Sequence, residues 1–529
     1  MIHVISKIPI QDTNLLKPIV KDYLNQDPFL NDFCSGFPRM ESIDHLIKQG
    51  FVRKTNRASL MNALRNQYEA CGINDSLIQR QIDSLLSEDT FTVCTGQQPG
   101  IFLGPLYTTY KILSAIHLSE ALKQRFPSKN FIPVFYMATE DHDFEEIKNT
   151  LVNGKKYTWD ASLKGPMGRY GTEQLLPLVN ELRQQFSGDN RIDQLIEIFD
   201  HAYHLDNLSK ATRYIIHKIF GHLGLLVIDP DDKSLKENFK QVIIDDLKNN
   251  ITSNELAKTL SRQLIKYKPQ VKGREVNYFY LRDNYRERIL LSEAGYSTAD
   301  KQYQWKEEEL FDEINQNPER FSPNVVTRPL YQETILPNIL YLGGGAEVAY
   351  WLQLKSCFDN FDIPFPLLFL RKSIIFLDAH HAKKIADLGL DTSDLFLPKE
   401  QSISQWIDRH FKEEIDLSEL KNRLKKFEES ITEISSSVSP PKAISAKAMV
   451  KKWENELIDF ENKLIREKKK IEKDKVDKID RIFEFIFPGG QFQERAESMV
   501  LLFLSKGDNV MDELLSLADP TDNNLLLIS

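Results

Sequence analysis

The sequence predicts an α/β protein built on a doubly wound parallel sheet, followed by an α-helical antiparallel coiled coil. Short, nearly all-apolar runs such as residues 131–138 alternate with helical segments, and strands that are apolar on both faces are typical of buried parallel sheets. Several of these runs end directly in glycine or charged residues, at the edge where ligands bind such sheets. After about residue 388, apolar residues recur at heptad spacing, which indicates the coiled coil.

Composition narrows the class of protein. The 529 residues carry a formal net charge of -9, which argues against a general nucleic-acid binder because such proteins are usually basic. The four cysteines lie far apart and form no CxxC pair, which excludes a disulfide scaffold and fits a reducing compartment. The sequence has no signal-peptide pattern and no apolar run long enough to span a bilayer. We therefore expect a cytoplasmic protein without nucleic-acid or membrane partners.

The first ninety residues have helical spacing, and the sheet begins after them. Residues 91–95 (FTVCT) form a short β-rich run, and a glycine-containing loop at 96–104 follows. Pro105 suits the first turn of a helix that runs to about residue 125. The apolar strand 131–138 comes next. This order of strand, loop, helix and strand predicts a βαβ unit.

Three later strands continue the sheet, at residues 225–228, 339–342 and 367–370. The intervals before the first two of them are about 85 and 110 residues, far longer than ordinary crossovers. We therefore expect insertions near 145–222 and 250–325. Asn153-Gly154 predicts a hairpin turn in the first insertion. The second contains a predicted hairpin of strands at 276–281 and 286–291.

Apolar residues at spacings of three and four run from Leu417 to Ile434 and resume from Val450 to Ile471. The Ser/Pro segment 435–441 separates them, and paired prolines cannot continue a helix, so an antiparallel helical hairpin is expected. Large apolar side chains such as Trp453 exceed what one hairpin can cover, which predicts a homodimer through this region. The predicted domains are a core at 1–388, the coiled coil at 389–486, and a helical segment at 487–529 that packs on the core.

The loop after the first strand holds the first candidate substrate-binding residues, Gln97, Gln98 and Gly100. Glycine lets the backbone approach a ligand closely, and the side-chain amides of glutamine can donate and accept hydrogen bonds toward a polar substrate. The spacing matches neither the dinucleotide fingerprint nor the phosphate-binding P-loop. A plain strand-to-helix turn is the alternative interpretation.

The segment after the second strand surrounds one histidine with three carboxylates, and its candidate catalytic residues are Glu140, His142 and Asp143. Neighbouring carboxylates should raise the pKa of His142 above about 6.5 and orient its ring for acid/base work. Oxygen ligands could also hold a divalent cation, but no second histidine is suitably spaced, so no metal site is predicted. The alternative is a charged helix start.

Further candidate binding residues follow the later strands. A triple glycine before a helix could cradle an anion, and a guanidinium could clamp a carboxylate or phosphate with two hydrogen bonds. These candidates are Tyr331, Gly343, Gly344, Gly345, Glu347 and Arg371. A flexible connector or a surface ion pair would explain the same residues.

Together these motifs resemble the BshC family of cysteine-adding enzymes of bacillithiol biosynthesis. The segments that carry the resemblance, besides the late heptads, are TGQQPGIFLGPLYTTYK (95–111), MATEDHDFEEI (137–147) and RPLYQETILPNILYLGGGAEVAYW (328–351). The resemblance implies a Rossmann-like core with connective-peptide insertions, similar to class I aminoacyl-tRNA synthetases, and a coiled coil that promotes dimerisation. The HxGH and KMSKS signatures of those synthetases are absent from the chain.

The resemblance implies a ligase that adds cysteine to glucosaminyl-malate, the last step in making bacillithiol. Activation of the cysteine carboxyl would use ATP or another nucleotide, and the sequence requires no metal. In this interpretation His142 accepts a proton from the amine with support from Glu140 or Asp143, and Arg371 holds the malyl carboxylate. Two alternatives are a non-catalytic coiled-coil assembly protein with a degenerate nucleotide-binding core, and a synthetase-like nucleotidyl or acyl transferase with another substrate.

Overall fold

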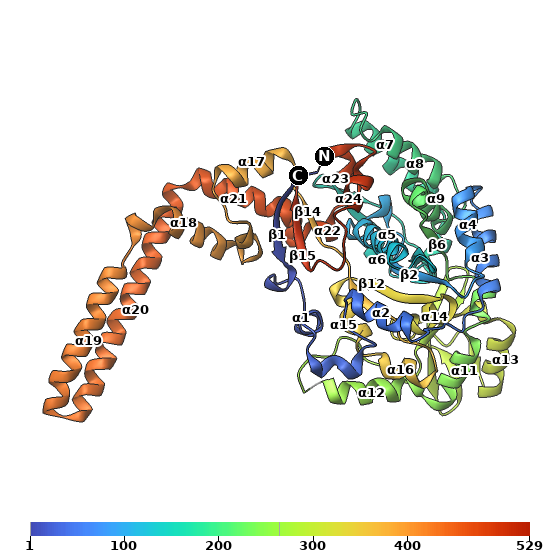
Figure 1. The fold of residues 1–529 in the computed structure, drawn as a ribbon, viewed down its shortest axis with the longest axis horizontal. Helices are drawn as coiled ribbons and strands as arrows, with labels where there is room; N and C mark the ends of the chain where they lie inside the picture. The colour runs from blue at the N-terminus through green and yellow to red at the C-terminus, as the bar shows by residue number, and fades with distance from the viewer. Residues whose placement is uncertain (1, 264) are drawn as a thin grey trace. The chain divides into compact units, whose positions relative to one another are not determined.

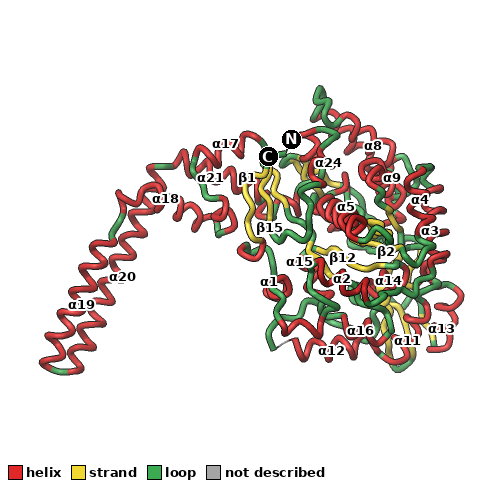
Figure 2. Tube along the Cα trace, in the orientation of Figure 1, coloured by secondary structure: helices red, strands yellow, loops and turns green. Residues whose placement is uncertain are grey.

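A computed structural model describes residues 2–263 and 265–529. The chain forms two compact units (Figure 1). The first contains the chain up to Phe376 together with Gln491–Ile528, and the second contains Leu377–Gly490. Every strand of the described residues belongs to the first unit, whereas helices build the second (Figure 2).

The main sheet of the first unit has five parallel strands in the order β13-β12-β2-β3-β6. All five predicted strands are confirmed: β2 (Thr90–Gln97), β3 (Asn130–Met137), β6 (Leu226–Ile228), β12 (Asn338–Gly343) and β13 (Leu367–Leu370). In chain order this is the arrangement 3-2-1-4-5 of Rossmann-like sheets, in which the direction of winding reverses between β2 and β12. Ligands are expected at that reversal.

Burial explains why these runs form a sheet. The side chains of β12 and β13 are buried on both faces. Helix α5 (Tyr107–Arg125) contacts β2, β3 and β12, and Leu113 and Ile116 on it are fully buried. Other helices of the unit are α1 (Pro18–Leu24), α2 (Met40–Lys48), α3 (Arg57–Glu69), α4 (Ser76–Ser84), α14 (Arg328–Ile335), α15 (Gly345–Trp351) and α16 (Lys355–Asn360).

Both predicted insertions are present. The first has a hairpin whose turn residues, Asn153 and Gly154, both have positive φ, at 50° and 78°, as a type I′ turn requires. Its elements are α6 (Phe144–Ile147), β4 (Asn149–Val152), β5 (Lys155–Thr158), α7 (Leu176–Gln185), α8 (Asp193–Tyr203) and α9 (Leu208–Phe220).

The second insertion extends the predicted hairpin into a five-stranded sheet of order β10-β9-β8-β7-β11. Its strands are β7 (Tyr278–Arg282), β8 (Tyr285–Ser292), β9 (Gly295–Thr298), β10 (Gln304–Trp305) and β11 (Phe321–Pro323). The accompanying helices are α10 (Lys233–Lys236), α11 (Lys240–Asn249), α12 (Ile251–Gln263) and α13 (Glu307–Gln316).

The two ends of the chain meet in a third sheet, of order β1-β15-β14. Its strands are β1 (Val4–Pro9), β14 (Ile374–Phe376) and β15 (Asn524–Ile528), and the last segment also contains α22 (Gln493–Ala496), α23 (Val500–Lys506) and α24 (Val510–Leu515). The expectation that this segment is wholly helical is therefore wrong. The strand β15 forms because β1, from the other end of the chain, pairs with it.

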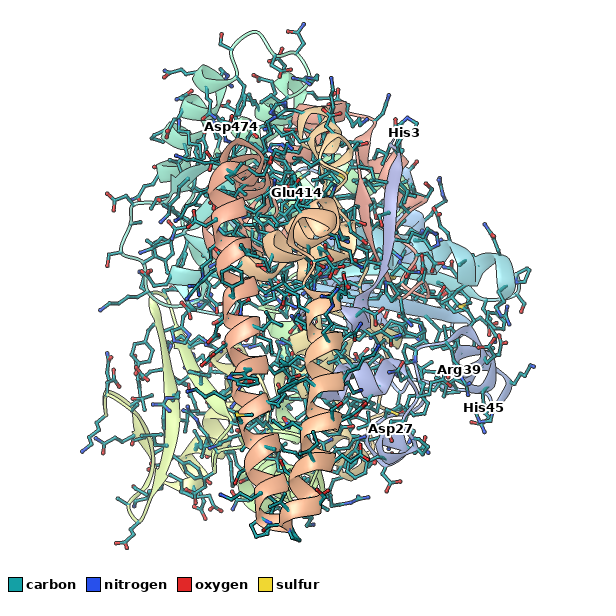
Figure 3. The ribbon with its side chains drawn as sticks, turned by 90° about the vertical axis from the view of Figure 1, so that its left-hand side faces the viewer. His3, Asp27, Arg39, His45, Glu414 and Asp474 are labelled. Atoms are coloured by element: carbon teal, nitrogen blue, oxygen red, sulfur yellow. The ribbon has the colours of Figure 1, made fainter. Side chains whose placement is uncertain are left out.

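The second unit is helical, with α19 and α20 side by side as a hairpin (Figures 1 and 3). Lys421 of α19 donates to Glu461 of α20 at 2.7 Å. The prolines of the predicted turn start the second helix rather than lie in a loop, a position that suits proline. The helices are α17 (Ala379–Asp387), α18 (Lys399–Ile415), α19 (Ser418–Val438), α20 (Pro440–Ile471) and α21 (Lys473–Ile486). In the part of the chain that the structure describes, no helix is both long and apolar enough to cross a membrane.

Candidate active site

A cavity of about 1510 Å³ lies at the carboxyl ends of the main-sheet strands. Each strand contributes wall residues where it ends: Gly96 and Gln97 of β2, Ala138 after β3, Pro230 after β6, Gly344 after β12 and Arg371 after β13. Phe279 and Arg286 come from the second insertion. The cavity thus occupies the place where a Rossmann-like sheet binds ligands.

The cavity brings together most of the residues predicted from the sequence. Its wall contains Gln97, Gln98, Glu140, His142, Asp143, Gly344, Glu347 and Arg371. Four predicted residues lie outside the wall: Gly100, Tyr331, Gly343 and Gly345. The structure gives each of these four a packing role.

Tyr331 is fully buried, and its hydroxyl donates to the carbonyl of Pro230 at 2.7 Å. The three glycines allow close backbone packing. A β-carbon at Gly100 would lie 2.2 Å from the carbonyl oxygen of Gly104. A β-carbon at Gly345 would lie 2.8 Å from Leu16, and one at Gly343 would lie 3.0 Å from the β-carbon of Glu347.

Arg371 is held by the protein itself. Its guanidinium donates twice to Glu494 of α22, at 2.8 and 2.5 Å, and both side chains are buried. Burial alone would lower the pKa of Arg371, but Glu494 more than offsets this and the net shift is upward. The two guanidinium nitrogens that were predicted to bind a ligand therefore already bind Glu494. Only Nε lacks a partner among the described atoms.

The triple glycine is not an open anion cradle. Glu347 accepts hydrogen bonds from the amide N–H of Gly344 at 2.8 Å and from the hydroxyl of Tyr341 at 2.6 Å, and Lys111 forms an ion pair with it at 2.5 Å. Burial would raise the pKa of Glu347, but Lys111 and these donors lower it overall. The carboxylate of this chain occupies the start of α15 where an external anion was expected.

His142 receives a hydrogen bond at Nδ1 from Arg286 at 2.5 Å. Its pKa is lowered, first by burial and then by the charge of Arg286, against the opposing effect of Asp141 and Asp143. The predicted rise in the pKa is therefore wrong, because burial of the ring and an arginine 144 residues away in the sequence together outweigh the adjacent acids. Arginine can only donate, so in the neutral ring Nε2 carries the proton. In this arrangement His142 presents a hydrogen-bond donor, not a base.

The expected support of His142 by Glu140 or Asp143 is also not found. Glu140 pairs with the buried Lys236, and burial raises its pKa. Asp143 is exposed at the start of α6 and makes no side-chain cap there. Instead Asp141 lies 3.7 Å from His142 Nδ1 and accepts its backbone N–H at 2.7 Å.

Several wall residues were missed from the sequence. The ring of Tyr107 has three cations over it, Lys111, Arg371 and Arg495, at 5.3–5.8 Å from its centroid. Arg328 of α14 donates to Tyr350 at 2.9 Å. Apart from Arg371, which was predicted and follows β13, these residues lie on helices whose apolar spacing concealed them. A single lysine among the buried positions of α5 was the available signal. Cations therefore gather at this end of the cavity, whereas carboxylates gather after β3.

Two further features bear on the chemistry. All four cysteines are unpaired and buried, and burial raises the pKa of the Cys94 thiol, as an unreactive structural cysteine requires. Within the described residues, no group of three or more His, Cys, Asp or Glu side chains is placed to hold a metal ion.

Two protein-family models match this chain and show which family it belongs to. Residues 4–372 match "Bacillithiol biosynthesis BshC, N-terminal Rossmann-like domain", and residues 374–529 match "Bacillithiol biosynthesis BshC, C-terminal coiled-coil domain". The chain belongs to the BshC family. Both halves of the predicted architecture are thus confirmed.

The similarity to BshC relatives extends over whole chains. A Flavobacterium johnsoniae protein is 35% identical over 99% of both chains. One from Christiangramia forsetii is 34% identical over 99% of this chain and 98% of its own. A Bacillus cereus protein is 28% identical over 94% of this chain and 96% of its own. Each of the three is named "Putative cysteine ligase BshC".

Proposed function

We propose that this protein is a ligase that joins the carboxyl group of cysteine to the amine of glucosaminyl-malate, the last step in making bacillithiol. The observation that carries the proposal is the cavity, in which a cation-rich wall and a carboxylate-rich loop lie at the strand ends of a BshC-family core. A substrate with a dicarboxylate at one end and an amine at the other matches this separation of charge.

The reaction forms a C–N bond, breaks the bond between the cysteine carbonyl carbon and the oxygen of its activating phosphoryl or nucleotidyl group, which leaves, and releases one proton from the attacking nitrogen. Asp143 lies on the wall without a capping hydrogen bond and is the candidate acceptor for that proton. His142 can donate from Nε2 to the oxygen on which negative charge develops. The positive charge near Tyr107, to which the exposed Arg495 contributes, attracts the malyl carboxylates, and the sugar lies beside Gln97 and Gln98.

An amide does not form readily from a free carboxylate in water, so the cysteine carboxyl needs activation. We propose ATP or another nucleoside triphosphate as the co-substrate that supplies this activation. No P-loop is present, but three exposed cations, Lys272, Arg274 and Arg288, line the cavity. None of them forms an ion pair with another described residue, so they fit a polyphosphate.

The test combines purified protein, cysteine, glucosaminyl-malate and ATP. We expect bacillithiol, detected by mass spectrometry after thiol labelling, with release of either pyrophosphate or phosphate. Cells that lack the protein should accumulate glucosaminyl-malate and lose bacillithiol. Cells that keep normal bacillithiol levels would overturn the proposal. We further propose that the protein works in the cytoplasm, since its four cysteines are unpaired.

A further inference from the structure

A continuous chain of hydrogen bonds joins the ends of β12, β2 and β3 along the cavity wall. It starts at Glu347 of α15 and passes through Lys111 of α5 to the side chains of Gln97 and Gln98. It ends at two carboxylates in the loop and helix after β3, Asp141 and Glu146. The chain connects the cation-rich wall with the carboxylate-rich loop.

Among the side chains of this hydrogen-bonded chain, Lys111 is the one whose bonding pattern cannot change. Its side chain is 2% exposed, and its ammonium has three acceptors for its three protons. They are the carbonyl oxygen of Gly96 at 2.7 Å, Oε1 of Gln97 at 3.0 Å and Oε2 of Glu347 at 2.5 Å. Burial lowers the pKa of Lys111, whereas Glu347 acts to keep it charged.

The lysine fixes the direction of every later bond, because an ammonium group can only donate. Gln97 must turn its oxygen toward Lys111, so its NH₂ group donates to Oε1 of Gln98 at 3.0 Å. Gln98 must then turn its own NH₂ group outward, where it donates to Asp141 at 2.9 Å and Glu146 at 2.5 Å. With the opposite orientation, the oxygen of Gln98 would face two carboxylates.

We propose that Lys111 is a positioning residue that sets the orientation of both glutamine amides and, through Gln98, holds the loop after β3. The loop is the part of the site that contains His142, whose backbone N–H donates to Asp141. The catalytic consequence rests on the proposed ligase function, whereas the positional consequence does not. Without the lysine, either glutamine can reverse, and Asp141 loses its fixed partner.

The main test compares Lys111→Met with Lys111→Arg. We expect Lys111→Met to lower kcat between about 10-fold and 10²-fold, the cost of misplacing reacting groups by about 1 Å, with KM for cysteine within about twofold of wild type. Lys111→Arg keeps a donor-only group and should recover part of kcat. A kcat of Lys111→Met equal to that of wild type would overturn the proposal.

Lys111 could instead serve only to neutralise the buried Glu347, and two variants separate these roles. Lys111→Met combined with Glu347→Gln removes both charges, and Gln97→Met cuts the chain while leaving the ion pair in place. We expect both variants to fold and to lose as much kcat as Lys111→Met does. Wild-type kcat in both variants would show that charge neutralisation is the whole role of Lys111.

Hydrogen exchange gives a readout that does not depend on the enzymatic activity. In Gln97→Met, the peptide that covers residues 138–147 should exchange faster than in wild type, whereas a peptide from β2 should be unchanged. Unchanged protection of 138–147 would overturn the positional claim. Faster exchange in Gln97→Met, together with a wild-type protein that makes no bacillithiol, would support the hydrogen-bonded chain while refuting the proposed reaction.

Discussion

Burial and the arginine beside His142 together favour the neutral ring, and the arginine also sets the direction of its hydrogen bonds. Asp141 and Asp143 favour the imidazolium, but burial and Arg286 favour the neutral form. Arg286 also stacks on Phe279, 3.8 Å from the ring centroid to its guanidinium carbon, so its position is fixed from two sides. A neutral histidine with its proton on Nε2 follows from this arrangement.

Removal of Arg286 should therefore raise the pKa of His142. In wild type the folded-state pKa lies below 6.5, so the ring is neutral at pH 7 and gains its proton only as the pH falls below that value. In Arg286→Met the acids act without opposition from this cation, and the ring should gain its proton at higher pH. NMR titration of ¹³C-labelled histidine, with His142→Asn to assign the signal, measures both values. An unchanged midpoint in Arg286→Met would contradict this account.

The role of His142 as a donor predicts a difference between two substitutions. His142→Leu removes the donor and should lower kcat by about 10²-fold or more, the usual effect of losing one such group. His142→Gln keeps an amide N–H at a similar reach and should retain much more activity. Equal losses in the two variants would indicate a role in proton transfer instead, because glutamine cannot titrate. Steady-state kinetics on both variants decides between the roles.

The elements of this fold differ in how far the sequence predicts them. The five main strands could be predicted because a strand buried on both faces is an unbroken apolar run. The strand β15 could not, because its pairing with β1 joins the two ends of the chain. At the site, the positions of Gln97 and His142 on the cavity wall could be predicted because both residues lie at strand ends. The position of Lys111 depends on how α5 packs, and that of Arg286 depends on how the second insertion folds. The local sequence pattern predicts which edge of the sheet binds a ligand. Contacts between distant parts of the chain determine which charged side chains lie at that edge.

The loop between β2 and α5 makes a prediction about stability. A β-carbon at Gly100 would overlap the carbonyl oxygen of Gly104, whereas one at Gly171 would have no atom within 4 Å. Gly100→Ala must therefore shift the loop, at a cost of about 1–3 kcal/mol, and should lower Tm. Gly171→Ala is the matched control and should leave Tm unchanged. Thermal unfolding followed by circular dichroism compares them, and equal Tm values would refute the packing role of Gly100.

At the scale of the whole molecule, the second unit exposes an unusual amount of apolar surface. The contact between α19 and α20 buries Val450 almost completely. Large side chains of both helices remain 39–67% exposed, among them Leu420, Phe427, Ile434, Trp453 and Phe460. A soluble protein rarely leaves such a surface uncovered, which marks it as an interaction site.

We propose that a second copy of the chain covers this surface, so that the protein is a homodimer through its helical hairpin. The exposed side chains lie on heptad positions that the hairpin covers only in part, and coiled coils commonly bury such positions against another helix. Phe427→Lys with Phe460→Lys places two charges on that surface and should convert the dimer to a monomer at micromolar concentration. Lys447→Glu with Lys463→Glu alters as many exposed positions of the second unit without touching an apolar side chain and should remain dimeric. Sedimentation velocity measures all three proteins, and a wild-type protein that sediments as a monomer would refute the proposal.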